Sequence, residues 1–134
     1  MNEANEPLLV LSIPYLPPSV NTHHTFRVEK GRIKVSLSAA ASKWKRDAAL
    51  FMGPKKLRDD WVYVVEVRLV GCWLDKTGQP IRKDCRNHGK LVVDALFERY
   101  GLNDKLVWHD TVVKVHHPKD ERVEIKLWRY GNDP

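Results

Sequence analysis

The chain between Arg82 and Asp104 reads RKDCRNHGKLVVDALFERYGLND, and its charged, amide and apolar residues are sorted by position. We placed residues 87–99, together with the turn before them, on a helix with about 100° per residue. Two sets of side chains then lie on opposite sides of the helix. The apolar side holds Cys85, Val92, Val93, Leu96 and Phe97, and the polar side holds Asn87, Lys90, Leu91, Asp94 and Glu98. Gly101 then provides the usual stop just past a helix end. The stretch predicts an amphipathic helix with one buried face and one charged face.

The charged face of this helix has two interpretations. Most charged helix faces are simply solvated, and the helix would then be an ordinary surface element. The alternative is a functional site, because Asp84 stands at the start of the helix and Asp104 follows its end in a turn. The two carboxylates would then flank a face that already shows a lysine and an aspartate.

The order of the residues resembles the RusA family of Holliday-junction resolvases. The pattern Asp-x-x-Asn-x-x-Lys-x-x-x-Asp-Ala-Leu begins at Asp84, passes through Asn87 and Lys90, and reaches Asp94. Asp104 then matches the acidic residue that follows the family's helix. The segment 17–21, Pro-Pro-Ser-Val-Asn, is a second and less specific point of similarity. The resemblance extends from Pro17 to the last predicted strand, but only residues 84–104 are specific.

The resemblance implies a Mg²⁺-dependent endodeoxyribonuclease that resolves four-way DNA junctions as a homodimer, with Mn²⁺ as a substitute ion. It implies Asp84, Lys90 and Asp104 as catalytic residues, and Asp84, Asp104 and Asp94 as metal ligands. Asn87 would support a ligand or a phosphate, and Asp110 is a substitute carboxylate. Hard oxygen ligands of this kind suit Mg²⁺, which keeps several waters and takes few carboxylates from the protein.

Arg86 departs from the family pattern, which has a second aspartate at this position. If residues 82–86 are extended, Arg86 lies beside Asp84 and competes with a metal ion. Two outcomes follow. Arg86 turns away and binds a DNA phosphate, and the site stays active, which is the outcome we expect. Otherwise Arg86 pairs with Asp84, and the protein binds junctions without cleaving them.

Length and charge limit the protein class. The 134 residues, 1–134, predict a single domain, and no apolar run approaches the length of a membrane span. The formal net charge of +6 favours an anionic partner, and nucleic acid fits best because a basic surface releases counterions from phosphates. The first residues are unlike a signal peptide, and the two cysteines are too few for a disulfide framework. We therefore expect a cytoplasmic protein, bacterial or phage-encoded, that associates with DNA.

A second helix is predicted from Ala39 to Met52, with Ser38 as its N-cap and Gly53-Pro54 as its stop. Its apolar stripe would be Ala40, Trp44, Ala48 and Phe51. Basic residues surround the stripe, and together with those before the motif they are the candidate DNA contacts: Lys43, Lys45, Arg46, Arg82, Lys83 and Arg86. A merely solvated basic face is the alternative.

The remaining segments predict strands. Residues 8–13, 31–37, 61–70, 106–115 and 122–128 have β-favouring or alternating patterns, and we expect the last two to pair antiparallel across the turn at 118–120. Residues 21–27 are expected to form a polar loop. The sum is an α+β domain with a mixed four- to five-stranded sheet and two main helices.

Other functions fit the sequence less well. The histidines at 88, 109, 116 and 117 lack the spacing of a zinc site, and no glycine-rich nucleotide loop is present. Two alternatives to a junction endonuclease stay open. One is a DNA-structure-binding protein without cleavage, and the other is a basic domain, for example RNA-binding, that resembles the family by accident.

Overall fold

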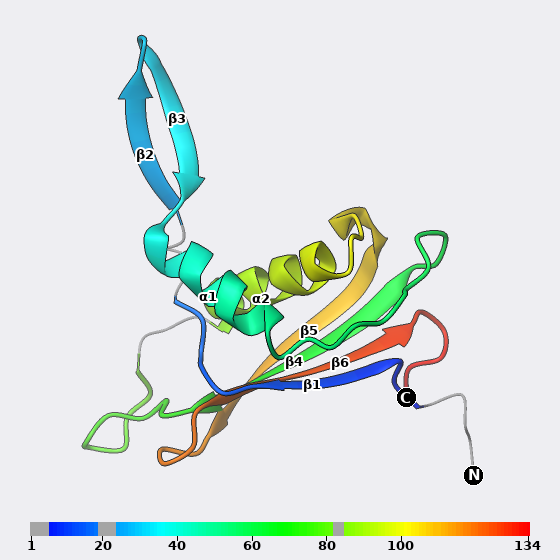
Figure 1. Cartoon of the computed structure of the whole chain (residues 1–134). Coiled ribbons are helices and arrows are strands. Elements are labelled where there is room, and N and C mark those ends of the chain that lie inside the picture. Colours follow the sequence, from blue (N-terminus) through cyan, green and yellow to red (C-terminus); the bar gives the residue numbers. More distant parts are fainter. Residues whose placement is uncertain (1–5, 19–23, 82–84) are drawn as a thin grey trace.

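The computed structural model describes residues 6–18, 24–81 and 85–134 as an α+β domain (Figure 1). Within residues 24–37 and 85–87 it describes the backbone and only some of the side chains. The elements in chain order are β1 Leu9–Ile13, β2 His24–Glu29, β3 Arg32–Leu37, α1 Ala39–Ala49, β4 Tyr63–Gly71, α2 Cys85–Arg99, the short 3-10 helix η3 Asp104–Leu106, β5 Val107–His116 and β6 Arg122–Arg129.

Four of the strands form one mixed sheet in the order β1-β6-β4-β5. β6 is antiparallel to both of its neighbours, whereas β4 and β5 are parallel. Parallel neighbours need a crossover connection, and α2 makes that crossing. The β2–β3 hairpin is a separate two-stranded sheet that projects away from the body (Figure 1). The predicted fold class, a mixed sheet with two main helices, is confirmed.

The core lies between the sheet and the two helices, which cover one face of it (Figure 1). β4 and β6 contribute alternate residues to this face, as the two-residue period of a strand requires. The buried side chains include Tyr63, Val65, Val67, Leu69, Val123, Ile125 and Leu127 from the strands, and Trp44, Ala48, Leu91, Val92, Leu96 and Phe97 from the helices. α2 is therefore held between the sheet and α1.

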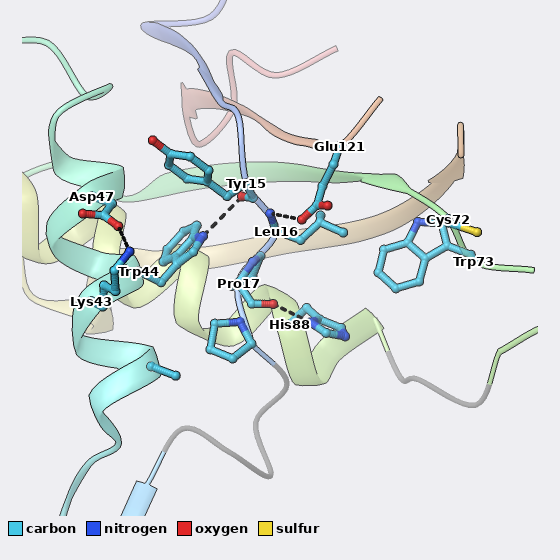
Figure 2. Close-up of a pocket in the computed structure, with 12 residues that line it drawn as sticks. Tyr15, Leu16, Pro17, Lys43, Trp44, Asp47, Cys72, Trp73, His88 and Glu121 are labelled. Atoms are coloured by element: carbon cyan, nitrogen blue, oxygen red, sulfur yellow. Dashed lines mark hydrogen bonds and ion pairs between the residues drawn. The ribbon is translucent and has the colours of Figure 1, made fainter. Parts of the chain in front are cut away.

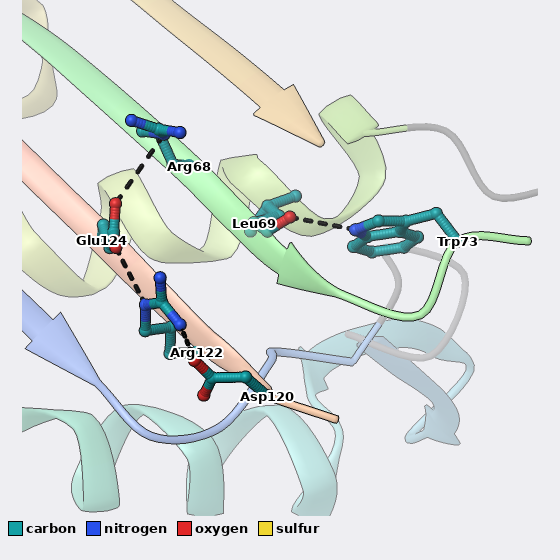
Figure 3. Close-up of polar contacts among 6 residues, drawn as sticks. All are labelled: Arg68, Leu69, Trp73, Asp120, Arg122 and Glu124. Atoms are coloured by element: carbon teal, nitrogen blue, oxygen red, sulfur yellow. Dashed lines mark hydrogen bonds and ion pairs between the residues drawn. The ribbon is translucent and has the colours of Figure 1, made fainter. Parts of the chain in front are cut away.

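The opposite face of the sheet carries a line of charges (Figure 3). The register places Arg68 opposite Glu124, and the Arg68 Nε atom lies 3.7 Å from Glu124 Oε2. Arg122 Nε donates to Glu124 Oε1 at 2.8 Å, and Arg122 also pairs with Asp120. Opposite charges on neighbouring strands contribute roughly 0.2–1 kcal/mol each, so this line favours the register more than it adds stability.

Three expectations about the elements are wrong. β5 and β6 do not form a hairpin, because β4 lies between them. Residues 24–29 form strand β2 and not a loop, since their main-chain partner is the strand that follows. The last turn predicted for α1 is absent: the helix ends at Ala49 and residues 50–52 form turns before Gly53.

The apolar stripe of α1 also differs from the prediction at two of its four positions. Ala41 is buried with Trp44 and Ala48, whereas Ala40 and Phe51 are exposed. The N-cap is confirmed: Ser38 has extended backbone angles, and its Oγ atom accepts a hydrogen bond from the Ala41 N–H at 3.1 Å.

Neither helix in the described part of the chain combines the length and the apolar composition that crossing a membrane requires.

Candidate active site between α2 and β5

A glycine in the middle of α2 lets this helix approach β5 closely. A Cβ atom on Gly89 would lie 2.5 Å from Val112 Cγ2, a distance that real Cβ contacts do not show. Any larger residue would push α2 away from the strand. Gly89 therefore seats the helix against β5, and Lys90, the next residue, is exposed at the edge of that contact.

The turn after α2 brings the chain to the same edge. Gly101 has a φ of +69°, and the Leu102 N–H donates to Phe97 O at 2.8 Å, as expected for a glycine that ends a helix. Asn103 then caps η3, with its side chain accepting from the Lys105 N–H at 2.9 Å. Asp104 is the first residue of η3 and is exposed. The helix stop and the cap together place this carboxylate.

These elements enclose an open pocket of about 940 Å³. Its polar lining consists of Lys90 and Asp94 from α2, Asp104 from η3, and Asp110 and Thr111 from β5. Val93, Val107, Val112 and Val113 form its apolar walls. Four of the residues selected from the sequence, Lys90, Asp94, Asp104 and Asp110, thus line one pocket although they come from three different elements.

The donor chemistry of this pocket fits a hard divalent cation. Three carboxylates line it, and Mg²⁺ is typically held by one or two carboxylates, with waters and substrate phosphate as its other ligands. Among the side chains that the structure describes, no three His, Cys, Asp or Glu residues are close enough together to hold one ion between them. An ion bound here would therefore need further ligands from water or substrate.

Several predicted site residues cannot be placed. Asp84, Arg82 and Lys83 lie outside the described residues, and the side chains of Asn87 and Arg86 are not described. The backbone corrects one premise, because Cys85 and Arg86 already belong to α2. Side chains alternate in direction along an extended chain but not along a helix. The expected position of Arg86 beside Asp84 therefore loses its reason.

The basic face predicted on α1 is partly neutralised by ion pairs. Lys43 Nζ lies 2.9 Å from Asp47 Oδ2, and Lys45 pairs with Glu98 of α2. Arg46 is exposed in the last turn of the helix. A groove of about 350 Å³ runs between the helices here, lined by Lys45, Arg46, Ala49, Ala95, Glu98 and Arg99.

Arg99 was not selected from the sequence, although it lines this groove. A basic residue in the last turn of a helix has an ordinary explanation, the interaction with the helix dipole, so no signal distinguished it. The groove joins it to Lys45 and Arg46, and the three cations share one groove with a single carboxylate, Glu98.

A second pocket, of about 830 Å³, lies where the segment 15–18 crosses between α1 and the first turns of α2 (Figure 2). Trp44 Nε1 donates to Tyr15 O at 3.2 Å, and His88 Nδ1 donates to Pro17 O at 2.9 Å. The Leu16 N–H donates to Glu121 Oε1 at 3.0 Å. These bonds connect the chain before the hairpin to both helices and to the loop before β6.

His88 lies in the interior of the domain, beside Trp73. It is buried, and its ring packs edge-on against Trp73 at 5.6 Å between centroids. His116 Nδ1 accepts from the Trp73 N–H at 3.0 Å. Two of the histidines considered for zinc are thus engaged with Trp73 and its surroundings.

Comparisons of the chain with models of known protein families and with curated protein sequences found no match.

Proposed function

We propose that the protein is a structure-specific endodeoxyribonuclease that hydrolyses a phosphodiester of four-way DNA junctions in the α2–β5 pocket. The observation that carries the proposal is that Lys90, Asp94, Asp104 and Asp110 line this one pocket. Three of them, Lys90, Asp94 and Asp104, are also residues that the sequence resemblance to the RusA resolvases selects. The chain's net charge of +6 is consistent with a polyanionic substrate.

Asp84 and Asp104, with Asp94 or Asp110, are the carboxylates that would hold Mg²⁺ or Mn²⁺. Such an ion, when bound, polarises the phosphate and stabilises charge on the oxygens of the reacting group. Lys90 Nζ supplies positive charge to the phosphate as negative charge develops on it. The basic residues of the groove between α1 and α2 would bind the DNA backbone.

The same fold supports a second candidate, a junction-binding protein that does not cleave. The observation that favours it is Arg86 in the place of an aspartate of the RusA pattern. In both cases we propose that the protein acts on DNA in the cytoplasm of a bacterial cell, and that it binds a junction as a homodimer.

The test is cleavage of a synthetic four-way DNA junction in Mg²⁺ and in Mn²⁺. Asp104→Asn should reduce cleavage at least about a hundredfold, because the loss of a ligand charge removes several kcal/mol of transition-state stabilisation. Junction binding should be nearly unchanged, since phosphate contacts provide the affinity. Asp104 is exposed, so the substitution leaves the core intact.

Asp59→Asn is the matched control, because Asp59 is an exposed aspartate in the loop before β4. It should cleave as the wild-type protein does. Wild-type protein that binds junctions but cuts none in either ion would favour the binding-only candidate. Full activity of Asp104→Asn would remove Asp104 from the site.

A further inference from the structure

The β2–β3 hairpin is an isolated, strongly basic ribbon. Its fourteen residues, 24–37, include Arg27, Lys30, Arg32 and Lys34 against one carboxylate, Glu29, so half of the formal net charge of +6 lies in it. It joins no other sheet and extends from the helix side of the body, away from the four-stranded sheet (Figure 1). Two-stranded hairpins of this kind are at best marginally stable by themselves in water.

The ladder and the tip of the ribbon both contain charged residues. The register sets Arg27 opposite Lys34, and Glu29 opposite Arg32. At the tip, Lys30 has a φ of +51° and Gly31 a φ of +73°. A positive φ is strained for lysine, and Asn-Gly is the favoured pair in such a turn. The tip thus carries a charged residue at a position where a polar, uncharged one is more stable.

The root of the ribbon is firmly attached. β3 ends at Leu37, Ser38 caps the next helix, and α1 begins at Ala39, so no flexible spacer separates the arm from α1. α1 carries the exposed Arg46 in its last turn. A duplex that lies over the helix layer would therefore meet the arm.

We infer that the β2–β3 hairpin is an arm that enters the major groove of a DNA duplex, where Lys30 and Arg32 contact the nucleic acid. The major groove admits a two-stranded β-ribbon, and strands of six residues extend about 20 Å. Lys30 and Arg32 are exposed, and so is Val28, with 75% of its surface accessible. An anionic partner would balance the excess positive charge of the ribbon, which has four basic residues and one carboxylate. The inference rests on the proposed function only for its DNA substrate and not for cleavage.

The test is the double variant Lys30→Asn plus Arg32→Thr, measured in EDTA on a 20-base-pair duplex and on a four-way junction. Asn-Gly favours the turn and threonine favours a strand, so the variant keeps or improves the hairpin while it removes two charges. We expect binding at least about tenfold weaker and a log–log salt dependence shallower by up to about 1.8. Lys119→Asn, a single charge removed from the exposed turn before β6, is the matched control and should change neither.

Dimethyl sulfate footprinting locates the arm, because guanine N7 lies in the major groove. Bound wild-type protein should protect a short run of guanines at N7, and the double variant should lose that protection. Unchanged affinity of the variant, or wild-type binding without N7 protection, would overturn the inference. The inference would also be overturned if the double variant kept N7 protection but changed its oligomeric state in sedimentation. That result would mean that the arm contacts a second copy of the chain.

These outcomes are independent of the cleavage test. If Asp104→Asn cleaves normally while the hairpin variant fails to bind, the proposed active site is wrong and the arm stands. If the hairpin variant binds normally while Asp104→Asn is inactive, the arm is wrong and the active site stands.

Discussion

Gly89 shows how one missing side chain positions the candidate site. Glycine within a helix is less favourable than alanine by about 1 kcal/mol, so its presence in α2 needs a reason. The reason is Val112, which occupies the space that a Cβ atom would need. Lys90 and Asp94 lie on the α2 side of the pocket and Asp110 on the β5 side, so the width of the pocket depends on this contact.

We expect Gly89→Ala to destabilise the protein although alanine favours helices. Overpacking a close contact lowers stability by about 1–3 kcal/mol, which exceeds the gain in helix propensity of about 1 kcal/mol. Adding Val112→Ala should recover part of the loss, because it removes the two methyl groups that the new Cβ meets. Urea unfolding of the two single variants and the double variant measures this coupling. Simple additivity would show that the two residues do not oppose each other.

Lys90 is the basic residue that lines the α2–β5 pocket. Lys90→Ala should lower kcat by about a hundredfold or more with little change in KM, as expected for a group that acts on the transition state. Lys105→Ala removes the same charge from η3, which lies beside the pocket, but Lys105 does not line it. The control should show at most a small effect on KM. An equal loss in both variants would mean that only the local positive charge matters.

At the scale of elements, α2 differs from its sequence prediction because it is covered on two sides. Leu91 was assigned to the polar face, yet it is buried, as are His88 and Ala95. A single apolar stripe describes a helix that packs against one partner, whereas α2 packs against both the sheet and α1. The assignment of Lys90 and Asp94 to the polar side does not depend on this error, because both lie on the part of the α2 surface that neither partner buries fully.

The strand order shows which signal was overlooked in the sequence. The pairing predicted for the last two strands was inferred from their proximity along the chain. β4, however, has a nearly continuous apolar run, and its Val64 and Val70 are buried on the face opposite the helices. Strands buried on both faces lie inside a sheet, and such a run predicts a central strand. The apolar run of β4 therefore predicts a strand that lies between two others, and in the structure β4 lies between β6 and β5.

The Ser38 cap determines where the hairpin ends and α1 begins. Ser38→Ala should lower the free energy of unfolding by about 1 kcal/mol, because the Ala41 N–H loses its acceptor. Ser38→Asp should restore most of this stability, since aspartate caps equally well. Ser42→Ala, within the helix, is the control and should be neutral or slightly stabilising. Thermal unfolding of the three variants distinguishes a cap from a general effect of losing a hydroxyl.

At the scale of the whole molecule, alkaline pH should weaken the fold through Tyr63. Burial raises the pKa of Tyr63, and its hydroxyl donates to Arg58 O at 2.5 Å. The folded protein therefore holds this proton more tightly than the unfolded chain does. Stability is complete below the unfolded pKa of about 10 and is lost as the pH rises above it.

Tyr63→Phe isolates that contribution. The variant should lose about 1 kcal/mol at pH 7, because Arg58 O loses its donor, and its stability should fall less steeply between pH 9 and 11. Urea unfolding at each pH measures both effects. Parallel curves for wild type and variant would show that other groups cause the alkaline loss. Tyr100, whose pKa burial also raises, is the first alternative.

The exposed aromatic residues at the β5 end of the sheet are the best place to look for a dimer interface. Trp61 and Val62, just before β4, are half-buried, and Trp61 packs between Arg58 and Arg129. Trp108 is 63% exposed and Tyr130 49%, and their rings are 5.3 Å apart.

Trp108→Ser should therefore weaken self-association in sedimentation with a DNA junction bound, because it removes most of this apolar patch, while Val10→Ser on the opposite edge strand should not. A monomer for the wild-type protein bound to a junction would remove the dimer.

The parallel pairing of β4 with β5 also determines when the pocket can form. These strands are separated in sequence by α2 and the loop before it, whereas the β2–β3 ribbon needs only a two-residue turn. Non-local pairings form slowly, because loop-closure entropy is lost before the contacts are gained. Lys90 and Asp110 therefore meet only when the β4–β5 ladder is complete. We expect a newly synthesised chain that has formed both helices to be still without its pocket.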